Sequence, residues 1–355
     1  MTPTLSVNRD RLWSSLMSLA EIGATAKGGN CRLALSALDG QGRDLLVRWM
    51  REAGLDVRVD AIGNLFGVRP GRRGSDHPVA TGSHIDTQPT GGKFDGCFGV
   101  LAGLEVMRCL QERGLETEDP LALVIWTNEE GTRFVPVMMG SGVHCGVFPL
   151  QTALDATDHA GLRVADELRA IGYGGGEPIG SVQPRSYVEA HIEQGPILEA
   201  QARTIGAVTG SLGLRWYDVV VTGQEAHAGP TPMPLRRDAL LGASQLIQQV
   251  LAIGHDPAFA PHGRATVGEL QLHPNSRNVI PGRVRFTVDL RHEDAATLDR
   301  MEARFRAAAA ALAEAPGPQG GAGLSVSVVD VQDFPPTPDR KSTRLNSSHG
   351  YISYA

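Results

Sequence analysis

The sequence lacks the features that would place it in a membrane, in a secretory pathway or on a nucleic acid. No apolar run approaches the roughly 18 residues that a membrane-spanning helix needs, and residues 1–20 have no signal-peptide core or cleavage site. The net charge of -6 offers no basic face for nucleic acid. The four cysteines have neither disulfide nor zinc-knuckle spacing, which indicates reduced thiols. We therefore expect a cytoplasmic protein that binds neither nucleic acid nor membrane.

The signatures of several large enzyme classes are also missing. The chain contains no Gly-x-Ser-x-Gly elbow and no cysteine in a nucleophile context. It contains neither a Walker-type phosphate loop nor a dinucleotide-binding glycine fingerprint. No internal repeat or heptad run is present. Any chemistry must therefore be sought in the polar clusters of the chain.

The first 210 residues predict an α/β layer fold with a mixed sheet, in an α/β/α arrangement. Helical and strand-like apolar patterns alternate along this part. Residues 121–127 are almost wholly apolar, as expected of a central strand that is covered on both faces. The predicted helices are 8–22, 41–53, 98–113 and 161–171, and the predicted strands are 55–59, 64–68, 78–81 and 121–127.

Residues 211–331 predict a second domain inserted into the first. Their elements follow the order β-α-β-β-α-β, which is typical of a ferredoxin-like unit with a four-stranded antiparallel sheet and two helices. The predicted strands are 214–222, 264–272, 283–290 and 324–331, and the predicted helices are 237–253 and 294–313. We expect residues 332–339 to return toward the first domain.

Residues 340–355 break the pattern. They hold one of only three lysines in the chain, four serines and no usable periodicity. We expect a non-native tail, with the native chain cut at about Asp339.

Three polar side chains follow the strand at 78–81, in a glycine-rich loop that leads into a helix. His84, Asp86 and Asp95 are all within reach of one point there. Imidazole and carboxylate groups are the ligands that zinc-like metals prefer. The alternative is an ordinary surface loop.

A second polar cluster, Glu129 and Glu130, follows the apolar strand 121–127. One carboxylate of such a pair can bind a metal while its neighbour moves a proton from water to a leaving nitrogen. In α/β sheets ligands collect at strand ends, which favours this interpretation over a solvated loop. His191 lies in a strand-like segment between two further acids.

Four ordered segments, 82–86, 91–96, 128–134 and 189–196, resemble the metal-dependent amidases of the hydantoinase/carbamoylase type. That group includes N-carbamoyl-L-amino-acid hydrolases, β-ureidopropionases and allantoate amidohydrolases, within the dinuclear-zinc aminopeptidase-like superfamily. The resemblance spans roughly residues 8–335. It implies metal-dependent hydrolysis of the carbamoyl C–N bond of N-carbamoyl amino acids or related ureido acids, with two divalent ions, Zn²⁺ first and Mn²⁺, Co²⁺ or Ni²⁺ as alternatives.

The resemblance also implies the role of each site residue. Asp95 would bridge two metals, with His84 and His191 completing the first site and Glu130 binding the second. Asp86 would fix the imidazole of His84. Glu129 would be the general base. A further histidine, expected beyond the inserted domain, has no match, because His349 lies in the unusual tail without the family context.

The inserted domain resembles a lid that also forms a homodimer. His227 would stabilise the developing oxyanion, and Asn278 and Arg291 would hold the substrate carboxylate, for which arginine offers a planar fork. Gln194, beside the metal strand, would face the substrate. Each of these four has the alternative of an ordinary polar residue in a turn or at a strand end.

Two other hypotheses stay open. The same scaffold could carry an N-acyl amino acid hydrolase or a dipeptidase. A chain that lacks the last metal ligand could instead be an inactive remnant that keeps the fold and the dimer surface.

Overall fold

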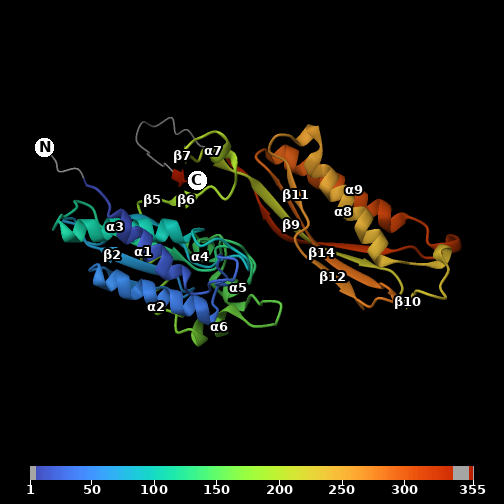
Figure 1. The fold of residues 1–355 in the computed structure, drawn as a ribbon, viewed down its shortest axis with the longest axis horizontal. Helices are drawn as coiled ribbons and strands as arrows, with labels where there is room; N and C mark the ends of the chain where they lie inside the picture. The colour runs from blue at the N-terminus through green and yellow to red at the C-terminus, as the bar shows by residue number, and fades with distance from the viewer. Residues whose placement is uncertain (1–4, 339–351, 355) are drawn as a thin grey trace. The chain divides into compact units, whose positions relative to one another are not determined.

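The computed structural model describes residues 5–338 and 352–354. They fall into two compact units that divide between Val208 and Thr209, close to the predicted boundary at residue 210 (Figure 1). No helix of the described residues is long and apolar enough to cross a membrane. The predicted tail at 340–355 lies outside the described residues except for 352–354.

A five-stranded mixed sheet organises the first unit, which confirms the predicted α/β class. Its order is β1-β2-β4-β3-β5, with β2 antiparallel to both of its neighbours, β1 and β4, and β3 parallel to both of its neighbours, β4 and β5. The strands are β1 (Asp56–Val59), β2 (Leu65–Arg69), β3 (Val79–His84), β4 (Leu121–Trp126) and β5 (Ser186–Val188).

The central strand β4 is buried on both faces, as its apolar sequence predicts. Leu123 and Ile125 join the large core formed with the helices, whereas Ala122 and Val124 join a smaller cluster with Phe66 on the opposite face. Burying each of the larger side chains, Leu123, Ile125 and Val124, stabilises the fold by roughly 1.5–3 kcal/mol. The polar residues that follow β4 are therefore held at the end of a rigid element.

The helices of this unit are α1 (Arg9–Ala20), α2 (Ala37–Glu52), α3 (Cys97–Glu112), α4 (Met139–His144), α5 (Leu150–Asp155), α6 (Val164–Ala170) and α7 (Ile197–Ala200). Helix α2 begins earlier than the predicted residue 41. Ser36 caps it by accepting a hydrogen bond from the Asp39 N–H. Gly40 and Gly42 weaken the helical pattern of these first residues in the sequence.

A small three-stranded sheet lies beside these elements. It has the order β6-β17-β7, with β17 parallel to β6 and antiparallel to β7. Its strands are β6 (Ala190–Ile192), β7 (Ile205–Ala207) and β17 (Ile352–Tyr354).

The second unit follows the predicted order of elements, except that two strands replace one of the predicted strands. Its sheet is antiparallel with the order β11-β14-β9-β15, and β12 also pairs with β14. Helices α8 and α9 cover one face (Figure 1), where alternate β14 residues such as Phe286 and Leu290 are buried against them. The elements are β9 (Gly213–Thr222), α8 (Ala239–His255), β11 (Arg264–Thr266), β12 (Leu270–His273), β14 (Arg283–His292), α9 (Ala295–Glu314) and β15 (Ser325–Phe334).

The single strand predicted at 264–272 is wrong, because it is divided into β11 and β12. Thr266 is opposite Asp289 and Leu270 is opposite Phe286. The segment between β11 and β12 therefore holds one residue more than the stretch of β14 that it faces. Such an extra residue is a β-bulge. Short ladders join β8 (Gly210–Ser211) to β16 (Thr337–Pro338) and β10 (Ala226–His227) to β13 (Val279–Ile280).

Candidate metal centre

The loop after β3 closes over His84. This histidine is the last residue of β3 and only 2% of its surface is exposed. Gly96, which precedes α3, has a φ of 63°, and a Cβ there would lie 2.5 Å from the His84 imidazole. Only glycine allows this backbone conformation at so close an approach. The glycine-rich sequence therefore brings Asp95 next to the ring.

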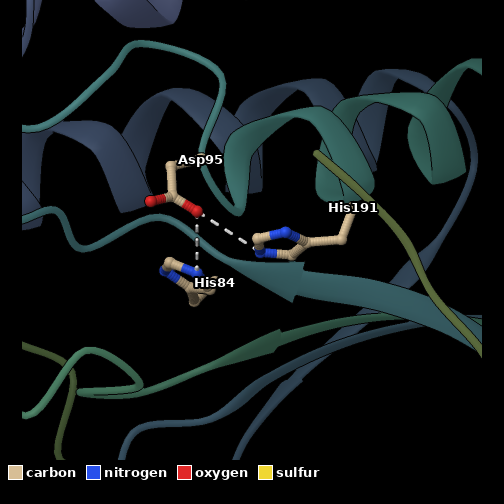
Figure 2. A group of neighbouring side chains, drawn as sticks. All are labelled: His84, Asp95 and His191. Atoms are coloured by element: carbon tan, nitrogen blue, oxygen red, sulfur yellow. Dashed lines mark ion pairs between the residues drawn. The ribbon is translucent and has the colours of Figure 1, made fainter. Parts of the chain in front are cut away.

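His84, Asp95 and His191 meet at one point (Figure 2). One potential ligand atom from each lies within 4.8 Å of the others. The Asp95 Oδ1 atom is 3.4 Å from the His191 Nε2 and 4.0 Å from the His84 Nε2. His84 comes from β3, Asp95 from the loop that precedes α3, and His191 from β6. The cluster therefore brings together residues that are far apart in the sequence.

Both imidazoles are oriented as metal ligands. The Nδ1 atom of His84 lies 2.9 Å from the main-chain oxygen of Asp86, and that of His191 lies 2.8 Å from the main-chain oxygen of Ile192. A carbonyl oxygen can only accept, so each Nδ1 donates and each Nε2 presents its lone pair toward Asp95. A hydrogen bond of this kind fixes the tautomer of most metal-bound histidines.

The residues of this cluster fit a divalent cation. Gln194 donates from its Nε2 to the Oδ2 of Asp95 at 2.6 Å. The other oxygen, Oδ1, is buried and has no hydrogen-bond partner among the described residues. A buried carboxylate oxygen without a hydrogen bond, beside two imidazole nitrogens, costs free energy unless a proton or a metal cation joins them. Two imidazoles and a carboxylate are also a usual ligand set of catalytic zinc.

Asp86 connects the ends of β3 and β4. Its carboxylate accepts hydrogen bonds from the main-chain N–H groups of Glu129 and Glu130, at 3.2 and 3.1 Å. The Oδ1 atom is 3.7 Å from the Nδ1 of His84, so it is the main-chain oxygen of Asp86 that makes the close contact with the imidazole. Asn128, at a φ of 51°, turns the chain so that both N–H groups face Asp86.

The two glutamate side chains have different partners. Glu129 places its Oε2 atom 3.5 Å from the Nε2 of His84. Glu130 lies outside the group of three, and its Oε2 accepts a hydrogen bond from the Nε2 of Gln88 at 2.6 Å. The Oε1 of Glu130 is buried without a hydrogen-bond partner in the described part of the chain. Glu129 therefore adjoins the metal cluster, and Glu130 keeps one oxygen available.

Electrostatics around the cluster favour a cation. Burial raises the pKa of Glu129. Burial, together with the charge of Asp95, outweighs the attraction of His84 and raises the pKa of Glu130 to about 7. Burial lowers the pKa of His84, but the charges of Glu129 and three further acids outweigh it and raise this pKa to about 9. The excess negative charge that holds a proton here would also hold a metal, which takes the proton's place.

The second unit carries the other predicted residues at two distant positions. His227 lies on β10, opposite Val279, and the next residue after it donates its N–H to the main-chain oxygen of Asn278 at 2.9 Å. Arg291 lies near the far end of β14 and binds Asp289 through its Nε and Nη2. Figure 1 labels β10 and β11, which pairs with Arg291, at opposite ends of this sheet.

The distance between these two positions in the second unit is large. Arg283, which begins β14 shortly after Asn278, and Arg291 are roughly 26 Å apart at about 3.3 Å per residue. A single chain therefore does not bring Arg291 together with His227 and Asn278.

Comparison with known proteins assigns this architecture to a family. Residues 80–333 match the family described as Peptidase family M20/M25/M40. The chain belongs to this family. The N-carbamoyl-L-amino-acid amidohydrolase of Rhizobium meliloti is 46% identical over 323 residues, which cover 91% of this chain and 76% of that protein.

Two further relatives narrow the assignment within the M20/M25/M40 family. The allantoate amidohydrolase of Bacillus subtilis is 38% identical over 286 residues, covering 80% of this chain and 69% of that protein. The crystal structure of the hydantoinase/carbamoylase family amidase from Burkholderia vietnamiensis has a TM-score of 0.89 at 53% identity, covering 95% of this chain and 79% of that one. The chain is thus an amidohydrolase of the hydantoinase/carbamoylase type, as the sequence resemblance predicts.

Sequence reasoning gave no role to two residues beside this M20-type centre. Gln88 binds Glu130 and also accepts a hydrogen bond from the Thr132 hydroxyl at 2.8 Å. Glu189 accepts hydrogen bonds from Ser83 and Tyr187. Gln88 lies two residues from Asp86, and Glu189 lies two residues from His191. This closeness in the sequence was the only signal for either residue, because their contacts depend on the tertiary fold.

Proposed function

We propose that this chain hydrolyses the carbamoyl C–N bond of N-carbamoyl amino acids or related ureido acids, with Glu129 as the general base. The observation that carries the proposal is the Glu129 carboxylate, 3.5 Å from the Nε2 of His84, beside three residues oriented as metal ligands. The names of the two amidohydrolases, one from Rhizobium meliloti and one from Bacillus subtilis, support the substrate class.

The cluster would hold divalent ions in two places. His84, Asp95 and His191 would hold the first, and Asp95 with Glu130 would contribute to the second. Zn²⁺ suits the two imidazoles and the carboxylate best, with Mn²⁺, Co²⁺ and Ni²⁺ as alternatives. When bound, such an ion lowers the pKa of water and polarises the carbonyl to be cleaved.

Glu129 moves the proton. Its carboxylate takes a proton from the attacking water and delivers it to the leaving nitrogen. Burial raises the pKa of Glu129 and so makes it a better base than an exposed glutamate. The bond between the carbonyl carbon and the amino nitrogen breaks, giving the free amino acid and carbamate, which decomposes to carbon dioxide and ammonia.

His227 is suited to oxyanion stabilisation. Its Nδ1 accepts a hydrogen bond from the Gly229 N–H at 3.1 Å. The neutral ring therefore carries its proton on Nε2, and this N–H can donate to a developing oxyanion. Gln194, already within 2.6 Å of Asp95, is proposed to contact the substrate from the metal side.

We also propose a homodimer formed through the second unit, with sites that use residues of two copies. Arg291 and Asn278 are both expected to hold the substrate carboxylate, yet in one chain Arg291 lies near the last residue of β14, whereas Asn278 precedes the first residue of that strand. A twofold-symmetric pair can bring Arg291 of one copy to the His227 and Asn278 of the other. The four free cysteines support a reducing, cytoplasmic setting.

A substrate panel tests the reaction. The protein, loaded with Zn²⁺, Mn²⁺ or Co²⁺, is assayed with N-carbamoyl, ureido and N-acyl amino acids. We expect ammonia and free amino acid in equal amounts from a carbamoyl substrate. Release of amino acid from N-acyl substrates alone would favour the acylase or dipeptidase alternative. No metal-dependent turnover of any substrate would contradict the proposal.

A further inference from the structure

We infer that Glu189 is a positioning residue of the metal centre, because it directly precedes the strand of His191 and its carboxylate contacts Ser83, beside His84, and Tyr187, which is bonded to the strand before the two glutamates. The inference rests on the proposed metal site. It concerns how the chain sets the distance between ligands that come from separate strands.

The main-chain ladder between β3 and β5 ends before His84 on the first strand and before β6, the strand of His191, on the second. Strands β3 and β5 pair in parallel up to Thr81 and Val188, and β6, which carries His191, pairs with β17. Beyond that point the Ser83 hydroxyl donates a hydrogen bond to the Oε1 of Glu189. Ser83 directly precedes His84. A side-chain bond therefore continues the contact where the backbone ladder stops.

A second contact brings in the strand that precedes Glu129. The Tyr187 hydroxyl donates to the Oε2 of Glu189 at 3.0 Å, and the Nε1 of Trp126 donates to the Tyr187 oxygen at 3.0 Å. Trp126 is the last residue of β4 and is 9% exposed. The hydrogen-bonded series Trp126–Tyr187–Glu189–Ser83 thus links β4, β5 and β3 at the edge where the metal cluster lies.

A carboxylate suits the centre of this series. Both oxygens of Glu189 accept from hydroxyl groups, whereas an amide could keep both contacts only if one hydroxyl reversed its role and accepted from the amide nitrogen. Within residues 5–338 and 352–354, no arginine, lysine or histidine forms an ion pair with Glu189, and its charge adds to the burial that raises the pKa of Glu129. Glu189 is also outside the group of three ligands. Its contacts fix neighbours of the ligands, so it acts on the metal through them.

Glu193 provides a matched control. It follows His191 by two residues, as Glu189 precedes it by two. Its carboxylate accepts from the N–H groups of Ile197 and Leu198, at 3.0 and 2.9 Å, and so caps α7 instead of contacting β3. Replacement of either glutamate by alanine removes one carboxylate at the same sequence separation from His191.

The test measures Zn²⁺ affinity of the 355-residue chain by competition with a chromophoric chelator, and the visible absorption of the Co²⁺ form. For Glu189→Ala we expect Zn²⁺ binding weaker by about 10- to 100-fold and an altered Co²⁺ spectrum. Ser83→Ala should weaken binding in the same direction, and the double variant should bind no more weakly than Glu189→Ala alone. Glu193→Ala should retain the wild-type affinity and spectrum.

The outcomes separate this inference from the proposed function. A wild-type chain that binds no metal overturns both. Wild-type binding with a Glu189→Ala chain of equal affinity, or with Ser83→Ala and Glu189→Ala effects that add, overturns the positioning role alone. If the metal-free Glu189→Ala chain fails to fold by circular dichroism, Ser83→Ala and Tyr187→Phe carry the test, and unchanged affinity in both overturns it.

Discussion

At the scale of single residues, Glu129 and Glu130 divide one task between neighbouring positions. Glu129→Gln should leave metal binding intact and lower kcat by about a hundred- to ten-thousand-fold, because the amide keeps the shape but cannot accept a proton from water. Steady-state kinetics together with metal analysis of the purified variant would check this.

Substitution of the neighbouring Glu130 should affect metal binding instead of proton transfer. Glu130→Gln should lose the second metal, because a neutral amide is a weaker ligand than a carboxylate. The hydrogen bond from Gln88 and the unpartnered Oε1 of Glu130 agree with a ligand role. If Glu129→Gln lost metal while Glu130→Gln retained it, the two roles would have to be exchanged.

At the scale of elements, the loop between β3 and α3 depends on Gly96. Gly96→Ala should reduce metal affinity severely, because the new Cβ would lie 2.5 Å from the His84 imidazole and the backbone has a φ of 63°. Gly92→Ala, in the same loop, is the control, since a Cβ there meets no atom within 4 Å. Equal Zn²⁺ affinities of the two variants in a chelator competition would show that the loop does not need this glycine.

The connection between β2 and β4 has a pH-dependent component. Asp60 is buried and accepts hydrogen bonds from the N–H and Nδ2 of Asn64, whose Oδ1 accepts from the Thr127 N–H beyond β4. Burial raises the pKa of Asp60 to about 6. The folded chain therefore binds this proton more tightly than the unfolded chain, and stability falls as the pH rises from about 4 to 6.

Asp60→Asn should remove this dependence, since the amide does not titrate. As the pH rises from 4 to 7, the unfolding free energy of the wild type should fall by roughly 3 kcal/mol relative to that of the variant. Urea unfolding of both proteins across this range measures it. A difference that stays constant with pH would contradict the raised pKa.

The sequence predicted those elements whose structure is determined by the pattern of their own residues. Strand β4 is apolar along its whole length, and its burial on both faces followed from that pattern. Helix α4 has no such pattern. Its Gly140 lies so close to Asn64 and Thr127 that an added Cβ would be 2.2 Å from the Asn64 side chain, which is a tertiary constraint.

The site was predictable to the same extent. A strand end and a glycine-rich loop indicated His84 and Asp95, and the family resemblance added His191; the structure brings the three together. The contacts of Gln88 and Glu189 are made by side chains of segments far apart in the sequence, so no local pattern could reveal them.

At the scale of the whole molecule, the proposed dimer can be tested by complementation. Arg291→Ala and His227→Ala should each be inactive alone. If each site takes Arg291 from one copy and His227 from the other, mixed dimers of the two variants contain one intact site, so random mixing should restore about a quarter of the wild-type activity. A mixture as inactive as its parents would show that one copy supplies both residues.

His84, Asp95 and His191 are proposed to hold the ion on which hydrolysis of a ureido acid depends. The most direct test is turnover of an N-carbamoyl amino acid, measured as Zn²⁺ is returned to metal-free protein. We predict no turnover without metal, a rise in proportion to the metal bound, and none in the His84→Ala/His191→Ala variant at any Zn²⁺ concentration. Full turnover by the metal-free protein or by that variant would contradict the account.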